Sequence, residues 1–421
     1  MAGGGPAGLI AALAVAHEVR AHEVGPHEGA HEVGAQARAG VTLMAPGIGA
    51  DYRPGDRERD TRTTALMGGS VALLDALDLW EGDGGVRAVS TPLEAIRIID
   101  DRGGLFRAPE LLFEAKEIGR ADFGVNVRNA ALVDVLHKAA VAHDRITMVA
   151  QAVAEVELSE TGVKLRTADG AVVDADVVVA ADGRGSMVRQ AAGIGVTTYP
   201  YPQHAVATAF AHRKPHRNVS SELHRAAGPL TTVPLGDDSD GRHWSSLVWV
   251  ETPGEAERLM ALDELAFRAE LELRLMGLLG VVLETSRRAT FPLVTMQAST
   301  LAAKRVLLAG EAAHVVPPIG AQGLNLGFRD AAVAAELIGQ ARADGRDVGS
   351  ADVMAAYAMA RRADILSREA MTDLLNRSLL SDMVPVQALR GLGLQALSTI
   401  GPLRRFAMRV GLDPPGVLPR L

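Results

Sequence analysis

The stretch that decides the fold is Val306-Leu307-Leu308-Ala309-Gly310-Glu311-Ala312-Ala313-His314, which continues through Val315-Val316 to Pro317-Pro318-Ile319-Gly320-Ala321-Gln322-Gly323-Leu324-Asn325. Its apolar start predicts a buried strand, and the carboxylate of Glu311 follows where that strand ends. The glycine-punctuated loop then leads into a helix expected over 326–342. Because the unpaired N–H groups at a helix start favour a negatively charged oxygen, we expect this loop to bind a ligand.

A second glycine turn lies at the beginning of the chain. Gly3-Gly4-Gly5-Pro6-Ala7-Gly8 matches the G-x-G-x-x-G pattern at Gly3, Gly5 and Gly8, ahead of an apolar helix that starts at Ala7. Such a turn lets the backbone approach a pyrophosphate at the helix N-terminus. The strand expected before it is reduced to Met1-Ala2, which predicts that the neighbouring strands lose hydrogen-bond partners and that the turn is loosened. A merely flexible glycine-rich segment is the alternative.

A third strand-to-turn segment lies between them. Val177-Val178-Val179-Ala180-Ala181 runs into Asp182-Gly183-Arg184-Gly185-Ser186. An aspartate at the end of a buried strand can accept hydrogen bonds from sugar hydroxyls or position a phosphate. A plain Asp-Gly turn is the alternative interpretation.

The remaining segments predict a domain assembled from separated pieces. We expect a strand at Val41–Ala45, a helix over Thr63–Leu79 and a helix over Asn129–Ala142 with Asn129 as N-cap. Three β-rich runs follow over 146–179, and residues 199–291 alternate like an antiparallel sheet around a helix near 262–275. From Ser350 onward the chain is mostly helical. Parallel-type strands thus flank an antiparallel block.

Composition excludes several classes of protein. The 421 residues carry 43 Lys and Arg against 51 Asp and Glu, a formal net charge of −8, so a nucleic-acid partner is not expected. With no cysteine, disulfides and cysteine-ligated metals are excluded. No apolar run of about 18 residues and no signal-peptide pattern appear, so we expect a cytoplasmic protein.

Taken together, these three segments make the sequence recognisable. It resembles the FAD-dependent aromatic hydroxylases of the p-hydroxybenzoate hydroxylase fold, and within them the ubiquinone-biosynthesis hydroxylases. The resemblance also rests on Arg62-Thr63-Thr64-Ala65-Leu66, on Ser221-Glu222-Leu223-His224 with Gly228-Pro229, and on Leu375 to Leu380. It covers nearly the whole chain except a His-Glu repeat over 16–35.

The resemblance implies an α/β fold. A Rossmann-like FAD-binding domain of the glutathione-reductase type is expected from discontinuous segments, with an antiparallel-sheet substrate domain and a helical C-terminus. The implied FAD-binding parts are 1–85 (with an insertion over 16–36), 100–188 and 286–345; the substrate-domain parts are 86–99 and 189–285; and the helical region is 346–421.

The resemblance also implies cofactor-binding residues. Gly3, Gly5 and Gly8 would bind the FAD pyrophosphate, Arg62 would pack near the isoalloxazine, and Asp182 with Gly183 would meet FAD and the reductant. Glu311 would bind the ribityl chain, and the backbone of Gly323, Leu324 and Asn325 would stabilise negative charge at the flavin N1–C2=O edge. The remaining implied cofactor contacts are Arg128, Val153, Pro318 and Gly320. No catalytic side chain and no metal ligand is expected, and His314 is expected to pack or cap rather than act as a base.

The implied reaction uses NADH or NADPH to reduce FAD, forms a flavin C4a-hydroperoxide with O2, and hydroxylates the aromatic ring of a polyprenylated ubiquinone precursor. A place in a ubiquinone-biosynthesis complex is implied as well. The stretch Leu389–Val410 mixes apolar residues with arginines, which is compatible with peripheral contact at the inner face of the membrane. A helix docked on the protein's own body is the alternative.

Three departures from the family pattern put cofactor binding in question, and the first is the strand reduced to Met1-Ala2. Ala45 stands where such folds usually carry an acidic residue for the ribose, which weakens FAD binding, and His27-Glu28-Gly29-Ala30-His31 formally matches a metalloprotease motif. Pro26, Gly29 and Gly34 oppose the helix that this motif needs. The alternatives are a hydroxylase of a soluble phenol or polyketide, and a flavin-free scaffold in a biosynthetic complex.

Overall fold

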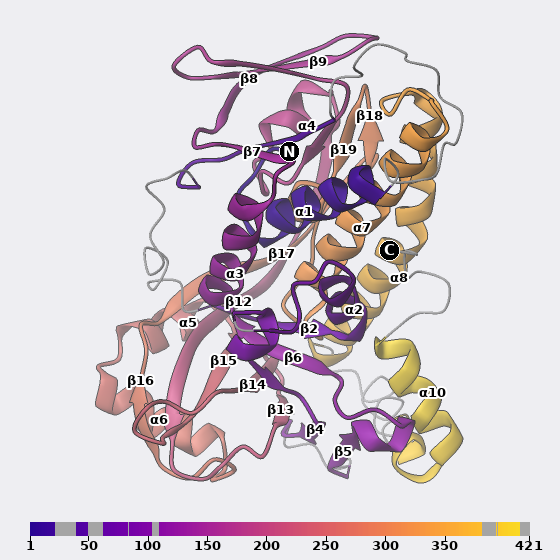
Figure 1. The fold of residues 1–421 in the computed structure, drawn as a ribbon. Coiled ribbons are helices and arrows are strands. Elements are labelled where there is room, and N and C mark those ends of the chain that lie inside the picture. The colour runs from indigo at the N-terminus through magenta and orange to yellow at the C-terminus, as the bar shows by residue number, and fades with distance from the viewer. Residues whose placement is uncertain are drawn as a thin grey trace.

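A parallel sheet forms one end of the molecule. The computed structural model describes residues 1–21, 39–48, 62–82, 84–102, 109–380, 393 and 395–412 (Figure 1). Parallel pairs join β1 (Val41–Met44) to β7 (Ile146–Val149) and β11 (Val178–Ala180) to β19 (Val306–Leu308), with β18 (Ala302–Ala303) antiparallel at the edge. Strands from both ends of the chain therefore meet in one sheet. The His-Glu motif at 27–31 lies outside the described residues.

Ala2 completes this sheet at its centre. It forms parallel bridges to Met44 of β1 and to Ala180 of β11. The Ala2 N–H donates to the Val179 carbonyl at 3.0 Å, and its own carbonyl accepts from the Ala181 N–H at 2.8 Å. The expectation that the neighbouring strands would lose their partners is wrong, because one residue suffices to join the two halves of the ladder.

Helices pack on the sheet and on one another. α1 (Pro6–Ala21) packs against α3 (Asn129–Ala142) and α7 (Gln322–Ala343), and its residues from Gly8 to Ala16 are all buried. A helix covered on all sides carries no polar face, as this sequence shows. Asn129 is not the N-cap of α3: Arg128 holds that position, and Asn129 Oδ1 instead accepts from Thr64 Oγ1 at 2.7 Å.

The helix expected over 63–79 is wrong in its first part. Residues Thr63–Met67 form β2, and α2 covers only Gly68–Ala76. β2 pairs with β6 (Gly124–Arg128), which also pairs with β3 (Ser90–Pro92) after the short 3-10 helix η1 (Val86–Val89). The β-branched Thr63 and Thr64 gain ladder hydrogen bonds in this small sheet, which local periodicity does not reveal.

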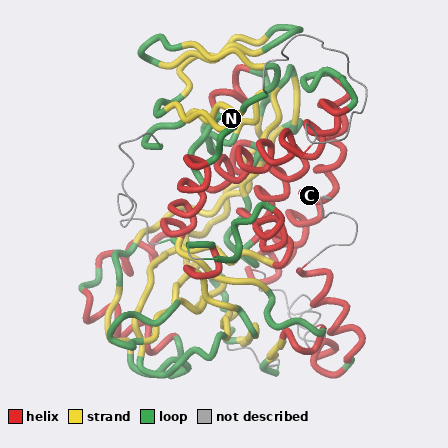
Figure 2. The backbone as a smooth tube through the Cα atoms, in the orientation of Figure 1, coloured by secondary structure: helices red, strands yellow, loops and turns green. Residues whose placement is uncertain are grey.

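Beyond the parallel sheet lies a three-stranded meander. β8 (Val153–Leu158), β9 (Val163–Thr167) and β10 (Val172–Ala175) pair in antiparallel fashion, as expected for this segment. The short helix α4 (Met187–Ala191) follows β11 and contacts β8. In Figure 2 the helices occupy the middle of the molecule, with the meander at one end and the largest sheet at the other.

A nine-stranded sheet forms that opposite end. Its order is β20 (His314–Val315), β17 (Ala289–Ala298), β12 (Val196–His212), β15 (His243–Glu251), β14 (Pro229–Leu235), β13 (Val219–His224), β4 (Ala95–Asp100) and β5 (Leu111–Glu114), with β16 (Val282–Thr285) beside β12. The pairs are antiparallel except β13 with β4. α5 (Pro253–Ala261) and α6 (Glu264–Arg274) complete a second core around Phe210, Trp249 and Phe267. β5, β17 and β20 also belong to this sheet, although their residues lie in segments that were predicted to bind FAD. The domain boundaries remain predictions.

The C-terminal region is helical. α8 (Ala351–Leu380) packs on α7, and α10 (Gly401–Leu412) rests on the short helix η2 (Ala115–Ile118). Arg404 of α10 pairs with Glu117 at 2.6 Å, and Met408 joins an apolar cluster with Phe113. Among the described residues, no helix is both long enough and apolar enough to cross a bilayer.

Candidate functional site

The first turn, Gly3–Gly8, is closed by backbone packing. A Cβ on Gly3, whose φ is +116°, would lie 2.1 Å from the Ala181 carbonyl oxygen, and a Cβ on Gly8 would lie 1.9 Å from that of Gly3. No L-residue with a side chain fits at either position. Gly5 differs, because nothing lies within 4 Å of the Cβ it lacks. The turn thus packs tightly on β11 and leaves its outer side open at the start of α1.

A cavity of about 470 Å³ opens beside this turn. Its size suits part of a nucleotide cofactor. The cavity brings together five of the fourteen predicted cofactor residues, and its lining includes Gly3, Gly5, Val153, Asp182 and Gly183. Ala45 also lines it and is 2% exposed, so an apolar methyl stands where nucleotide-binding folds usually carry a ribose-binding carboxylate.

The second turn, Asp182–Ser186, offers an acceptor to this cavity. Asp182 Oδ2 accepts from the backbone N–H groups of Met187 at 2.9 Å and Val188 at 3.3 Å. Its Oδ1 is buried, and within the described part of the chain it has no hydrogen-bond partner. A buried acceptor of this kind favours a hydroxyl donor from a ligand. Together with the close-packed glycines, Asp182 fits a dinucleotide such as FAD.

The third turn, Gly310–His314, lies beside the first two. The Ala309 N–H donates to the Ala180 carbonyl at 2.8 Å, and a Cβ on Gly310 would lie 3.0 Å from the Ala7 Cβ at the start of α1. Glu311, between the buried Gly310 and Ala312, has an exposed side chain. Gly8, Asp182 and Glu311 therefore belong to three turns that meet at one edge of the parallel sheet.

Arg189 links the second turn to the third. Its guanidinium Nη1 donates to the Ala312 carbonyl and its Nη2 to the Arg184 carbonyl, both at 2.9 Å. This buried arginine was missed by the sequence reasoning. Its position three residues after Ser186, whose hydroxyl caps α4, was the available signal.

The start of α7 is fixed by the side chain of Asn325. Its Oδ1 accepts from Met67 N–H at 2.8 Å and Ser70 Oγ at 2.7 Å, and its Nδ2 donates to the Ala65 carbonyl at 2.8 Å. This clamp holds the segment that follows Arg62 against the predicted flavin-edge loop. The sequence predicted only a backbone role for Asn325, so the clamp is an addition.

The other predicted residues lie outside the cavity lining. Pro318, Gly320, Gly323 and Leu324 flank the start of α7, where Ala321 adopts a left-handed φ of +53°. The Arg128 Cζ lies 6.0 Å from the Trp244 ring, and burial lowers the pKa of Arg128.

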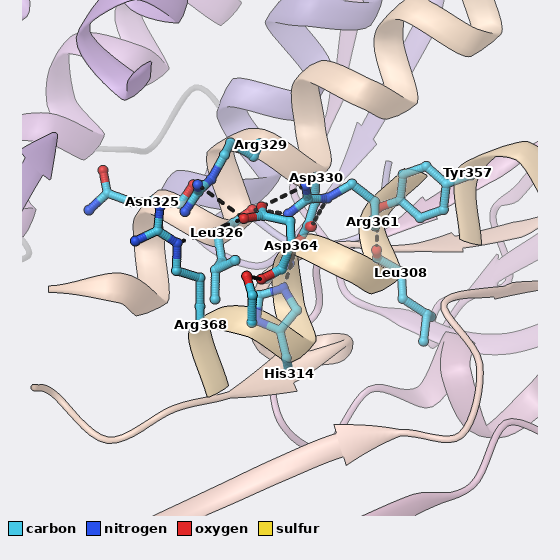
Figure 3. Close-up of polar contacts among 12 residues, drawn as sticks. Leu308, His314, Asn325, Leu326, Arg329, Asp330, Tyr357, Arg361, Asp364 and Arg368 are labelled. Carbon is cyan, nitrogen blue, oxygen red and sulfur yellow. Dashed lines mark hydrogen bonds and ion pairs between the residues drawn. The ribbon is translucent and has the colours of Figure 1, made fainter. Parts of the chain in front are cut away.

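His314 packs as the sequence suggested. It is 2% exposed, and its Nε2 lies 2.7 Å from Asp330 Oδ2 in a buried network of charged side chains (Figure 3). Its imidazole bonds this carboxylate and does not line the cavity. No group of three or more potential metal ligands occurs among the described residues.

Comparisons with known proteins agree with this geometry. Residues 110–364 match the family described as "FAD binding domain". The chain is 35% identical to the ubiquinone hydroxylase UbiL of Rhodospirillum rubrum, over 85% of this chain and 82% of that protein. It is 28% identical to the 3-demethoxyubiquinol 3-hydroxylase of Escherichia coli, over 85% of this chain and 88% of that protein.

Solved structures show the same fold. The p-nitrophenol 4-monooxygenase PnpA of Pseudomonas putida aligns with a TM-score of 0.72 at 20% identity, covering 100% of this chain and 97% of that one. HpxO of Klebsiella pneumoniae, solved with FAD and uric acid, aligns with a TM-score of 0.69 at 17% identity over 97% of this chain and 95% of that one. At these identities the likeness concerns the fold.

Proposed function

The chain belongs to the FAD-binding family of flavin-dependent hydroxylases, and from this premise we propose that it hydroxylates the aromatic ring of a polyprenylated ubiquinone precursor with NADH or NADPH and O2. It is an FAD-dependent monooxygenase. The observation that carries the proposal is 35% identity to a ubiquinone hydroxylase over 85% of the chain.

The residues of the three turns would divide the work of holding FAD. The first turn and the start of α1 would take the pyrophosphate, and the buried Asp182 Oδ1 would accept a hydroxyl. Glu311 would accept from the ribityl chain. When bound, FAD supplies the redox and oxygen-transfer chemistry. Arg62, Arg128, Val153, Gly183, Pro318 and Gly320 complete the proposed contacts.

The start of α7 would provide the electrostatic contribution. The backbone of Gly323, Leu324 and Asn325, where the first N–H groups of the helix lack a partner within it, would face the edge of the flavin that becomes negative on reduction. The Asn325 clamp supports this role because it holds those N–H groups in place before the ligand binds. The nine-stranded sheet would cover the aromatic ring and exclude water.

The test is NAD(P)H oxidation by FAD-loaded protein, with and without a prenylated phenol, coupled to product mass. We expect ring-dependent oxidation and a mass gain of one oxygen atom. Turnover of a soluble phenol with no response to prenylated ones would instead support the alternative substrate class. Protein that stays colourless after FAD addition would contradict the cofactor assignment.

Contact with a membrane surface is the finer part of the proposal. On α10 and just before it, Ile400, Leu403 and Phe406 are exposed, while Met408 faces the protein's own apolar cluster. Arg405 and Arg409 are exposed on the same helix. An apolar strip with neighbouring arginines suits an anionic bilayer surface. Assembly with other enzymes of ubiquinone biosynthesis would bring the protein to the same surface.

Sedimentation with phosphatidylglycerol vesicles tests this contact. We expect Phe406→Ser to lower the bound fraction several-fold, at about 0.8 kcal/mol per buried CH₂. Leu265→Ser is the matched control, because Leu265 is an exposed apolar residue on α6, away from α10. Equal binding by both variants would contradict the assignment of α10.

A further inference from the structure

One buried carboxylate holds both ends of the third turn. Asp330 lies in α7 and is 0% exposed. Its Oδ2 accepts from the Gly310 backbone N–H at 2.9 Å and from His314 Nε2 at 2.7 Å. Figure 3 shows Asp330 and His314 directed toward one another. Since Gly310 and His314 are the ends of the turn that carries Glu311, Asp330 constrains everything between them.

The second oxygen of Asp330 connects the turn to α8. Asp330 Oδ1 accepts from Arg361 Nε at 2.7 Å, and Arg361 Nη1 donates to Asp364 Oδ2 at 2.8 Å. One turn earlier in α8, the Tyr357 hydroxyl donates to the carbonyl of Leu308 in β19 at 2.6 Å. A C-terminal helix thus holds the strand and the turn that follows it.

Stability alone does not account for these charges. Burying an ion pair costs several kcal/mol per ion, and apolar residues of similar volume often pack at equal or lower free energy. Although burial opposes ionisation, His314 and Arg361 hold the pKa of Asp330 at about 2, so its carboxylate is charged at neutral pH. What the carboxylate provides is directed hydrogen bonding, which an apolar core lacks.

The directed bonds converge around one exposed carboxylate. Gly310 is fixed by Asp330 and the Ala312 carbonyl by Arg189, while Glu311 between them has an exposed side chain. Gly310 also packs against Ala7 at the start of α1. The backbone on both sides of Glu311 is therefore immobilised at the edge where the three turns meet.

We propose that Asp330 is a positioning residue that holds the Gly310–His314 turn so that Glu311 can accept a hydrogen bond from a hydroxyl of the flavin's ribityl chain. This inference rests on the proposed function, because FAD is the ligand that Glu311 would meet. Arg361 acts through Asp330 by fixing the carboxylate from α8. No proton moves, so the effect is on cofactor affinity.

A double-mutant cycle tests the inference. The variants are Asp330→Asn, Glu311→Gln and the pair together, with FAD titrated into apoprotein and followed by flavin fluorescence. We expect each single variant to weaken the FAD Kd about tenfold, the loss typical of one hydrogen bond to a charged group. The double variant should be no weaker than either single one, because both changes remove the same contact.

Asp364→Asn is the matched control. Asp364 is also buried and also bonds Arg361, but among the described residues it forms no hydrogen bond or ion pair with the third turn. Its FAD Kd should stay within about twofold of wild type even where the melting temperature falls. If Asp330→Asn does not fold, Arg361→Lys takes its place in the cycle. We expect Arg361→Lys to weaken FAD binding less than Asp330→Asn would, and to cause no further loss of affinity in protein that already carries Glu311→Gln.

The outcomes separate this inference from the function. Wild-type protein that does not bind FAD overturns both. Protein that binds FAD and is indifferent to Glu311→Gln, or shows additive losses in the cycle, overturns the positioning role and leaves the flavin assignment intact. Equal weakening by Asp330→Asn and Asp364→Asn would mean general loosening, which also overturns it.

Discussion

The first and third turns lie side by side, yet they are closed in opposite ways. Gly3–Gly8 closes because side chains are absent, with backbone atoms where Cβ atoms would otherwise lie. Gly310–His314 closes because side chains are present, with Asp330 and Arg189 bonding its backbone. The first turn should therefore be sensitive to added volume, and the third to lost charge.

Added volume at Gly8 should have the largest effect. Gly8→Val places carbon where the Gly3 carbonyl oxygen lies 1.9 Å away, so we expect a loss above about 4 kcal/mol and no retained flavin colour. Thermal unfolding and visible absorbance after FAD addition measure it. Gly5→Ala is the control, and it should change the free energy of unfolding by less than about 0.5 kcal/mol. Similar losses in both variants would contradict close packing as the cause.

Lost charge beside the third turn should come next. Arg361→Met leaves Asp330 and Asp364 buried without their shared cation, at a cost of about 3–5 kcal/mol in the free energy of unfolding. Denaturant unfolding measures it. The neighbouring Arg362 is exposed, so Arg362→Met should cost less than about 0.5 kcal/mol. A small loss for Arg361→Met would show that the carboxylates find other partners.

Near the Asp330 network, ionisation of Glu369 is unfavourable in the folded state. Burial raises the pKa of Glu369 from 4.5 to about 7, against an opposing effect of His314. Its Oε1 is buried and lacks a hydrogen-bond partner among the described residues. Between these two pH values the unfolded state is ionised while the folded state keeps the proton, so stability falls as pH rises through that window and stays lower above it.

Glu369→Gln removes that penalty. Allowing for partial exposure to solvent, we expect the variant to exceed wild type by about 1 kcal/mol above pH 7 and by nothing near pH 4.5. Denaturant unfolding at the two pH values measures the difference. A gain that is equal at both would mean that packing, not ionisation, is responsible.

The smallest effect should come from adding an acceptor to the first turn's cavity. Ala45→Glu supplies the carboxylate that nucleotide-binding folds usually carry at this strand end. One added hydrogen bond is worth about 0.5–1.5 kcal/mol, so the FAD Kd should tighten about two- to tenfold. Ala45→Gln, which has a similar shape and no charge, should give less. Weaker FAD binding by both variants would mean that the added side-chain volume at position 45 outweighs the added hydrogen bond.

Prediction from sequence succeeded where structure is local. The turns at Asp182 and Glu311 were located from a buried strand followed by a glycine and a carboxylate. This pattern lies within about ten consecutive residues, so it is visible in the sequence alone. It failed at Thr63–Met67, since that strand depends on pairing with β6 some 60 residues away. The Asp330 network was also missed, because a buried charge has no signature apart from the partners that α8 brings to it.

β12 runs between the two largest apolar cores that the described residues form. Near its start, Val196 pairs with Ala298 of the core under the parallel sheet, and farther along Val206 and Phe210 belong to the core of the nine-stranded sheet. Because β12 has residues at both cores, loss of either core would remove packing and hydrogen-bond partners from a strand that the other core also uses. We therefore expect heat to unfold both halves in one calorimetric transition, with the van't Hoff and calorimetric enthalpies equal.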